Sequence, residues 1–299
     1  MVSNSEFERR VRDQFEEGQK FIYKEEQYQV IVAGKPRPSS GRGECKTDCY
    51  VKLKNISTSQ ERELKISCKL ININDFQENK IKASRAEQIF GPNWQDIIQG
   101  KSEEIRDKFL STGLNYPEGK GRTKEGHLIL GWKLEISSEK NPRTLSRPLD
   151  LSDNQIRESI YKGVDQDQGK VDSKVNGIIV AGSGVANYML EANLEDIQSP
   201  GDVLDRLVNI DEFPIKPHHM IFTSNAYRIN SGETDGNRPL AVRVVWKSPS
   251  QKLSSPYDLI PKIEFHDPLG VKSNSNTMRE NVDLIFNEFP ELNIKYKKK

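Results

Sequence analysis

The chain has 299 residues, with 45 Lys and Arg against 44 Asp and Glu and a net charge of +1. This balance excludes a global field that would coat the protein with nucleic acid or hold it on an anionic membrane, so an anionic partner needs a local basic patch. No apolar run reaches the roughly 20 residues of a membrane span, and residues 1–10 are too polar for a signal peptide, so we expect a cytoplasmic protein with no membrane partner.

The first half of the chain alternates helix and strand signals. A capping box of Ser5 and Glu8 predicts a first helix that ends at Gly18, and its apolar stripe consists of Phe7, Val11 and Phe15. Alternating apolar residues over 49–54 and 63–70 predict two strands joined by a polar turn. Beyond them the pattern predicts helices over 84–90 and 102–113, a strand over 128–136, and a helix that begins at a capping box of Ser152 and Gln155.

The second half is richer in strand signals. Strands are predicted over 176–181, 185–191, 220–230, 240–247 and 262–266. Asp235 and Gly236 form a good hairpin turn between the third and fourth of these strands. A last helix is predicted over 278–289, where apolar residues return with helical spacing.

The two strands around residue 58 can pair as an antiparallel hairpin, and one register explains both faces. If the turn spans 57–60, one face is wholly apolar, with the opposite pairs Cys49 and Cys68, Val51 and Ile66, and Leu53 and Leu64. Because side chains alternate, the other face is polar, with the opposite pairs Asp48 and Lys69, Tyr50 and Ser67, and Lys52 and Lys65. This register predicts an acid beside an amine at the open end of the hairpin. Cys45, Cys49 and Cys68 are odd in number and lack zinc spacing, so we expect reduced thiols.

An acid and a lysine so placed suit metal-assisted hydrolysis of a phosphodiester. Asp48 would bind a hard cation such as Mg²⁺, and Lys69 would orient a water molecule or neutralise the phosphate. A phosphate-binding loop is the competing interpretation of residues 41–47, but Cys45 stands where that loop needs glycine and a strand follows instead of a helix. The plainest alternative is a cross-strand ion pair on a solvated sheet face, worth at most about 1 kcal/mol.

Asp48, Ser67 and Lys69, in the segments KTD and ISCK, resemble the motif of the PD-(D/E)xK nucleases, the superfamily of most type II restriction endonucleases. The resemblance implies an α/β fold with a restriction-endonuclease-like core, a mixed central sheet flanked by helices, and residues 84–90 as a helix beside the site. It implies that Asp48 binds the metal, that Cys68 adds its backbone carbonyl, and that Lys69 aids the nucleophile. It also implies Mg²⁺ as the cofactor, with Mn²⁺ able to substitute and Ca²⁺ non-productive, and a homodimer on double-stranded DNA.

The chain departs from the family pattern at one important position. Ser67 replaces the second carboxylate, so we expect another acid to complete the site. If the strand extends backward, Glu44 lies on the same face as Asp48 and could serve as this acid. The first helix offers further acids that the sequence does not rank: Glu6, Glu8, Glu16 and Glu17.

Two kinds of residue are candidates for DNA contact. Residues 30–54 carry six basic side chains against two acidic ones, which suits phosphate contact at Lys35, Arg37, Arg42 and Lys46. A second basic loop offers Lys120, Arg122 and Lys124. Base readout needs amide or guanidinium side chains on a rigid scaffold, and the candidates are Asn225, Arg228, Asn230, Asn237 and Arg238. A solvated loop and a polar hairpin are the competing interpretations.

The sequence thus predicts a nuclease core over 1–165 and a β-rich region for recognition or dimerisation over 166–299. The expected activity is Mg²⁺-dependent cleavage of double-stranded DNA, as in a type II restriction enzyme. A repair or junction-resolving nuclease is one alternative. A catalytically inactive nucleic-acid-binding module is the other, because Ser67 replaces an acid.

Overall fold

The computed structural model describes residues 3–41, 43–71, 78–118, 126–138, 144–229, 233–273, 283, 285 and 287–290. The chain forms two compact units, residues 1–76 with 150–216 and residues 77–149 with 217–299, and so passes between them three times. The units therefore do not follow the predicted division at residue 165. The reason is that strands from both halves of the sequence pair within each of the two larger sheets. None of the described helices has the length and hydropathy of a membrane span.

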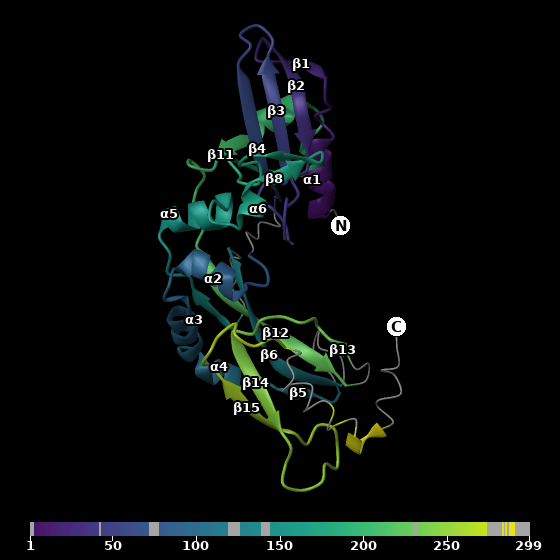
Figure 1. Cartoon of the computed structure of the whole chain (residues 1–299), viewed down its shortest axis with the longest axis vertical. Coiled ribbons are helices and arrows are strands. Elements are labelled where there is room, and N and C mark those ends of the chain that lie inside the picture. The colour runs from purple at the N-terminus through teal and green to yellow at the C-terminus, as the bar shows by residue number, and fades with distance from the viewer. Residues whose placement is uncertain are drawn as a thin grey trace. The chain divides into compact units, whose positions relative to one another are not determined.

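The first unit contains a six-stranded mixed sheet (Figure 1). Its strands run in the order β1 (Lys20–Tyr23), β2 (Glu26–Gly34), β3 (Cys49–Asn55), β4 (Glu61–Leu70), β10 (Tyr188–Ala192) and β11 (Leu207–Asn209). Neighbours are antiparallel except β4 and β10, which are parallel. The same unit holds the helix α1 (Asn4–Arg12), α5 (Asp153–Gln155), the π-helix η1 (Ile156–Lys162), α6 (Gln168–Val171), the hairpin β8 (Ser173–Val175) and β9 (Ile178–Val180), the 3₁₀ helix η2 (Leu194–Asp196) and α7 (Pro200–Arg206).

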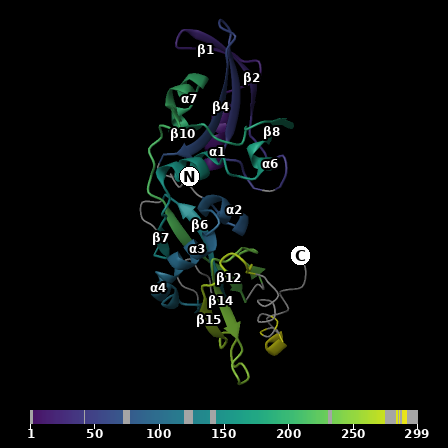
Figure 2. The same ribbon diagram turned by 60° about the vertical axis from the view of Figure 1, so that its left-hand side comes forward.

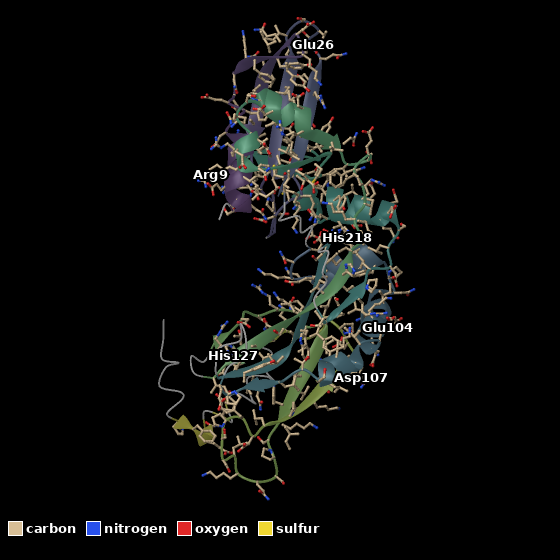
Figure 3. All side chains as sticks on the ribbon, turned by 180° about the vertical axis from the view of Figure 1, so that it is seen from behind. Arg9, Glu26, Glu104, Asp107, His127 and His218 are labelled. Carbon is tan, nitrogen blue, oxygen red and sulfur yellow. The ribbon has the colours of Figure 1, made fainter. Side chains whose placement is uncertain are left out.

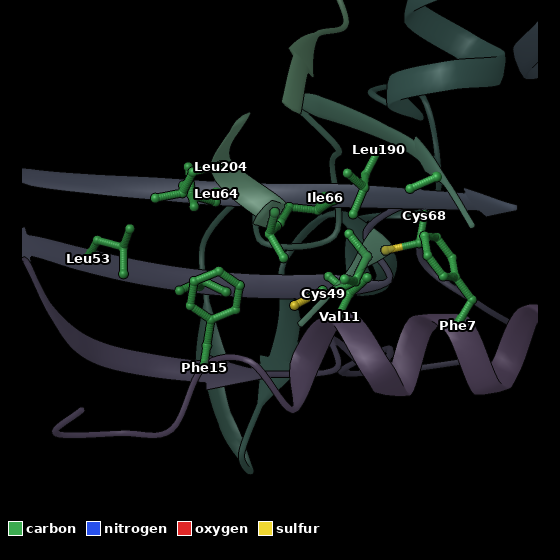
Figure 4. Close-up of a cluster of buried hydrophobic side chains, with 14 of the residues drawn as sticks. Phe7, Val11, Phe15, Cys49, Leu53, Leu64, Ile66, Cys68, Leu190 and Leu204 are labelled. Atoms are coloured by element: carbon green, nitrogen blue, oxygen red, sulfur yellow. The ribbon is translucent and has the colours of Figure 1, made fainter. Parts of the chain in front are cut away.

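Helix α1 packs against one face of this sheet. Its cap is Ser3, whose hydroxyl accepts from the Glu6 N–H at 3.2 Å, and not the predicted Ser5. Figure 4 shows Phe7 and Val11 of the helix beside the strands β3 and β4. The apolar stripe and the apolar hairpin face form one core, which includes Phe7, Val11, Phe15, Cys49, Val51, Leu53, Leu64, Ile66, Cys68 and Leu190. The predicted faces of the hairpin are therefore confirmed.

The predicted register of that hairpin is wrong by two residues. The observed opposite pairs are Cys49 and Ile66, Tyr50 and Lys65, Val51 and Leu64, Lys52 and Glu63, Leu53 and Arg62, and Lys54 and Glu61. The cause is the turn, in which the buried Asn55 side chain accepts from the N–H groups of Ser57 and Thr58 at 2.9 and 3.0 Å. The Asn55 N–H donates to the Gln60 carbonyl at 2.8 Å, which centres the turn one residue earlier than predicted. A shift of two residues leaves every side chain on its predicted face.

The second unit is built on a curled antiparallel sheet (Figure 2). Its main strands run in the order β13 (Glu233–Thr234), β12 (His219–Arg228), β6 (His127–Ser137), β14 (Val242–Lys247) and β15 (Ile260–Glu264), with β5 (Asn115–Tyr116) and β7 (Ser146–Pro148) at the side. The helices α2 (Ala83–Phe90), α3 (Trp94–Glu103) and α4 (Arg106–Leu110) belong to the described part of this unit. Phe109 of α4 packs edge-on against Trp132 and Phe222 in the core.

One predicted connection in the second half is wrong. Residues 235 and 236 do not join two paired strands, because β6 lies between β12 and β14 in the sheet. Strand β9 pairs with β8, and β10 pairs with β4. The predicted helix over 278–289 falls mostly outside the described residues.

Candidate active site

Asp48 lies at the open end of the β3–β4 hairpin, where the two strands part. Strand β3 begins at Cys49, whereas β4 continues to Leu70. The Asp48 N–H donates to the Ile66 carbonyl at 2.8 Å, and its Oδ2 accepts from the Cys68 N–H at 2.9 Å. The carboxylate thus takes the place of a backbone acceptor beside β4, and its position is fixed by the sheet.

Lys69 is the other half of the predicted pair. Continued by one residue, the observed register sets Asp48 opposite Ser67, so Lys69 is a diagonal neighbour and not the predicted directly opposite one. Its charge still acts on Asp48, and Lys69 is half-buried. Ser67 is buried. The structure therefore brings Asp48, Ser67 and Lys69 to one end of the hairpin, in a different pairing from the one expected.

The second acid of the cluster is Glu8 of α1. Its Oε2 lies 2.6 Å from the Lys35 Nζ and 3.8 Å from an Arg12 Nη1. The same Arg12 nitrogen donates to the Asp48 carbonyl at 3.3 Å, which connects the helix to the start of β3. The negative charge of Glu8 also acts on the Asp48 carboxyl. Glu8 follows the buried Phe7 and stands one turn before Arg12, a position that places it at the edge of the packed stripe.

The other acids that the sequence left open are placed differently. Glu6 is exposed in the first turn of α1, and Glu16 is exposed beyond its end. Glu17 accepts from the Asn176 Nδ2 at 2.7 Å. Glu44 is exposed, although its charge acts on Lys35. Glu8 is therefore the best-placed partner for Asp48.

The environment raises the pKa of Asp48 to about 6. Burial is the main cause, since it penalises the charged carboxylate, and the nearby charge of Glu8 adds to it. The positive charges of Lys69 and Lys35 and the Cys68 N–H act in the opposite direction. Two carboxylates close together and partly removed from water form a site at which a bound cation is strongly stabilised.

The donor set fits a hard divalent cation. Asp48 and Glu8 supply carboxylate oxygens, which Mg²⁺ prefers together with water. The contact between the Lys35 ammonium and Glu8 shows that a cation is accommodated at this acid. Within the described ranges, His, Cys, Asp and Glu side chains form no group of three or more suited to a metal ion. An ion here would therefore depend on two carboxylates, completed by a carbonyl or by water.

The cysteine thiols, and the histidines His127 and His218, are not candidates for a role at this site. Cys45, Cys49 and Cys68 are free and buried, as expected from the sequence. Burial raises the pKa of Cys49 to about 12, so that thiol stays protonated at neutral pH. His127 and His218 are buried in the second unit (Figure 3).

The candidate DNA contacts have mixed outcomes. Arg37 is exposed, while Lys46 is half-buried. Asn225 is only 1% exposed and its Nδ2 donates to the Gly236 carbonyl at 3.1 Å, so the prediction that it reads a base edge is wrong. Arg228 pairs with Asp235, whereas Asn237 is exposed and Arg238 is half-buried. Five candidates lie outside the described residues: Arg42, Lys120, Arg122, Lys124 and Asn230.

The helix beside the site is also different from the expected one. The sequence pointed to residues 84–90, but these form α2 in the second unit. The helix that packs on β3 and β4 is α1. No family model, curated protein or solved structure matches the chain, so the chemistry of the site is argued from its own residues.

Proposed function

We propose that this protein is a Mg²⁺-dependent endonuclease that hydrolyses phosphodiesters of double-stranded DNA. The observation that carries the proposal is the convergence of Glu8, Asp48 and Lys69 at the open end of the β3–β4 hairpin. Two acids can hold a metal ion that activates water, and an amine beside them can offset the charge of the phosphate. Glu8 supplies the charge that is missing at Ser67.

Each residue has a defined role in this proposal. Asp48 and Glu8 would hold the cation through carboxylate oxygens, with the Cys68 carbonyl as a further ligand. A bound Mg²⁺ would supply an activated water and stabilise the charge that develops on the phosphate. Lys69, whose charge acts on Asp48, would orient the attacking water and offset the negative charge of the phosphate. Arg12 holds the helix and the strand together, and so keeps the two acids in place.

The fold of the first unit is compatible with a restriction-endonuclease-like core of the PD-(D/E)xK type. It has a mixed sheet, with β10 parallel to β4, and a helix packed on the strands that carry the motif. On this basis we propose a sequence-specific type II restriction enzyme that acts as a homodimer on DNA with twofold symmetry. Exposed basic side chains such as Arg37, which follows Lys35 by two residues, would contact the phosphate backbone.

One experiment distinguishes this function from its two alternatives. Purified protein is incubated with Mg²⁺ and either a plasmid or a four-way DNA junction. A restriction enzyme gives discrete plasmid fragments, a junction-resolving nuclease cuts the branched DNA preferentially, and an inactive binding module leaves both intact. We expect discrete fragments, and we expect Asp48→Asn and Lys69→Ala to abolish cleavage while DNA binding in Ca²⁺ is retained. Near-normal cleavage by either variant would refute the site assignment.

A further inference from the structure

The ammonium group of Lys35 contacts Glu8, one of the two candidate metal ligands. Its Nζ lies 2.6 Å from Oε2 of Glu8, and both side chains are largely withdrawn from solvent, with 32% and 14% exposed. Electrostatic attraction also acts between Lys35 and both Asp48 and Glu44. A lysine ammonium is a compact point charge, so in this position it neutralises the same carboxylates that a divalent ion would bind.

The backbone around Lys35 is held firmly on both sides. On one side, Gly34 pairs with Tyr50 of β3, and a Cβ atom at Gly34 would lie 2.5 Å from the Asn176 Oδ1, so this backbone and the Asn176 side chain pack closely. On the other side, Arg37 and Lys174 exchange two backbone hydrogen bonds, at 2.9 and 2.7 Å. The fold therefore fixes the backbone position of Lys35. Its flexible four-carbon side chain can still move away from Glu8.

Arg12, the second basic residue at Glu8, is held differently. Its guanidinium is farther from Glu8, at 3.8 Å, and it donates to the Asp48 carbonyl. Arg12 thus has a structural role that joins α1 to β3. Lys35 is in close contact with a candidate ligand oxygen, and a metal ion that binds Glu8 would have to break this contact.

We infer that Lys35 is a built-in counter-ion of the active site, which occupies Glu8 in the metal-free protein and must be displaced when a divalent cation binds. The inference depends on the proposed metal-dependent function. Lys35 acts here as a positioning residue for the acids, since it keeps two neighbouring carboxylates in place without a metal. The same ammonium lowers the affinity of the site for the ion, because each cation excludes the other from Glu8.

The test is the affinity for Mn²⁺ alone, measured by calorimetry without DNA. Lys35→Met removes the charge and keeps the length of the side chain, and Lys35→Arg keeps the charge. The matched control is Lys52→Met, since Lys52 forms a similar ion pair with Glu61 at 2.7 Å, at the opposite end of the hairpin, and has 30% of its side chain exposed. Glu8→Gln and Asp48→Asn show whether the measured Mn²⁺ binds at this site.

We expect Lys35→Met to bind Mn²⁺ about tenfold more tightly than wild type, the change that follows when a hydrogen-bonded ion pair no longer has to be broken. Lys35→Arg and Lys52→Met should stay within about twofold of wild type, because neither frees Glu8. Glu8→Gln and Asp48→Asn should lose the binding. Circular dichroism of each variant confirms that the fold is retained.

Equal or weaker Mn²⁺ binding by Lys35→Met overturns the inference, as does the absence of binding in both proteins. The plasmid assay separates this failure from failure of the proposed function. Cleavage by the wild type together with unchanged Lys35→Met affinity would refute the counter-ion alone. Tighter Mn²⁺ binding by Lys35→Met without any cleavage would support the counter-ion and refute the nuclease.

Discussion

The Asp48 carboxylate accepts a hydrogen bond from the backbone N–H of Cys68 at 2.9 Å. This bond joins the residue before β3 to a strand that continues past it, so a side-chain oxygen satisfies an amide on β4. The acid is therefore part of the sheet's hydrogen bonding as well as a candidate ligand. The orientation of the Asp48 side chain is set by the backbone of the neighbouring strand.

The raised pKa of Asp48 predicts that the metal-free protein gains stability when this acid is removed. A folded-state pKa of about 6, above the ordinary value of 3.8, means that the native state binds the proton more tightly than the unfolded state does. The stabilising contribution of the protonated carboxyl is complete below about pH 4 and is lost as the pH rises through about 6. Ionised Asp48 therefore destabilises the protein at neutral pH.

Asp48→Asn should accordingly raise the free energy of unfolding at pH 7.5 by on the order of 2 kcal/mol and have little effect near pH 4. Urea denaturation at both pH values measures the difference. Asp172→Asn is the control, because the Gly182 N–H lowers the pKa of Asp172 and its charged form is favoured in the native state. A loss of stability in Asp48→Asn at pH 7.5 would contradict the prediction.

Glu8 can be tested against another acid of the same helix. Glu8→Gln should reduce Mg²⁺-dependent cleavage by at least about tenfold, because a charged ligand is lost while the shape of the side chain is kept. Glu6→Gln removes an exposed acid from the first turn of α1 and should leave cleavage within about twofold of wild type. Single-turnover rates at saturating DNA give the comparison. Equal rates for both variants would exclude Glu8 from the site.

Bound metal should stabilise the protein in a pH-dependent way. If Mn²⁺ binds the proposed site in the native state, it should raise the melting temperature of the wild type at pH 7.5. At pH 5 the rise should be much smaller, because protons compete for Asp48 below its pKa of about 6. Differential scanning fluorimetry at the two pH values measures this effect. A rise of the same size in Asp48→Asn would show that the ion binds elsewhere.

The packing of α1 should control stability as well as site geometry. Phe7 is fully buried against the sheet, so Phe7→Ala should lower the free energy of unfolding by about 3–5 kcal/mol. Ile22→Ala provides the control, since Ile22 is 73% exposed and its loss should cost less than about 0.5 kcal/mol. Guanidinium denaturation followed by circular dichroism checks both values. A small effect for Phe7→Ala would argue against the helix as a support of the site.

The sequence predicted those parts of the fold that depend on periodicity. The stripe of Phe7 and Val11 and the alternation over β3 and β4 give the correct faces, because burial follows parity. Periodicity could not predict the register, because a shift of two residues leaves every side chain on the same face. The position of the turn is set by the hydrogen bonds of the Asn55 side chain. Strands β1 and β2 were missed because β1 has only four residues and because β2 has a single fully buried residue, so neither strand presents a strong apolar pattern.

The candidate site was predictable only where the motif is local. Asp48, Ser67 and Lys69 lie on one hairpin, and sequence reasoning found them together. Glu8 could not be ranked above its neighbours, because its place beside Asp48 depends on how α1 packs across the sheet. Asn225 was misjudged for a similar reason, since its burial follows from the packing of the second unit.

The parallel pairing of β10 with β4 has a consequence for how the protein is made. Leu190 and Cys68 stand side by side in the sheet, yet more than a hundred residues of chain must be synthesised between them. Until β10 leaves the ribosome, β4 has an unpaired edge of the kind that recruits other strands. The nascent chain therefore carries the candidate site in an unfinished sheet, and a fragment that stops before Tyr188 should aggregate rather than fold.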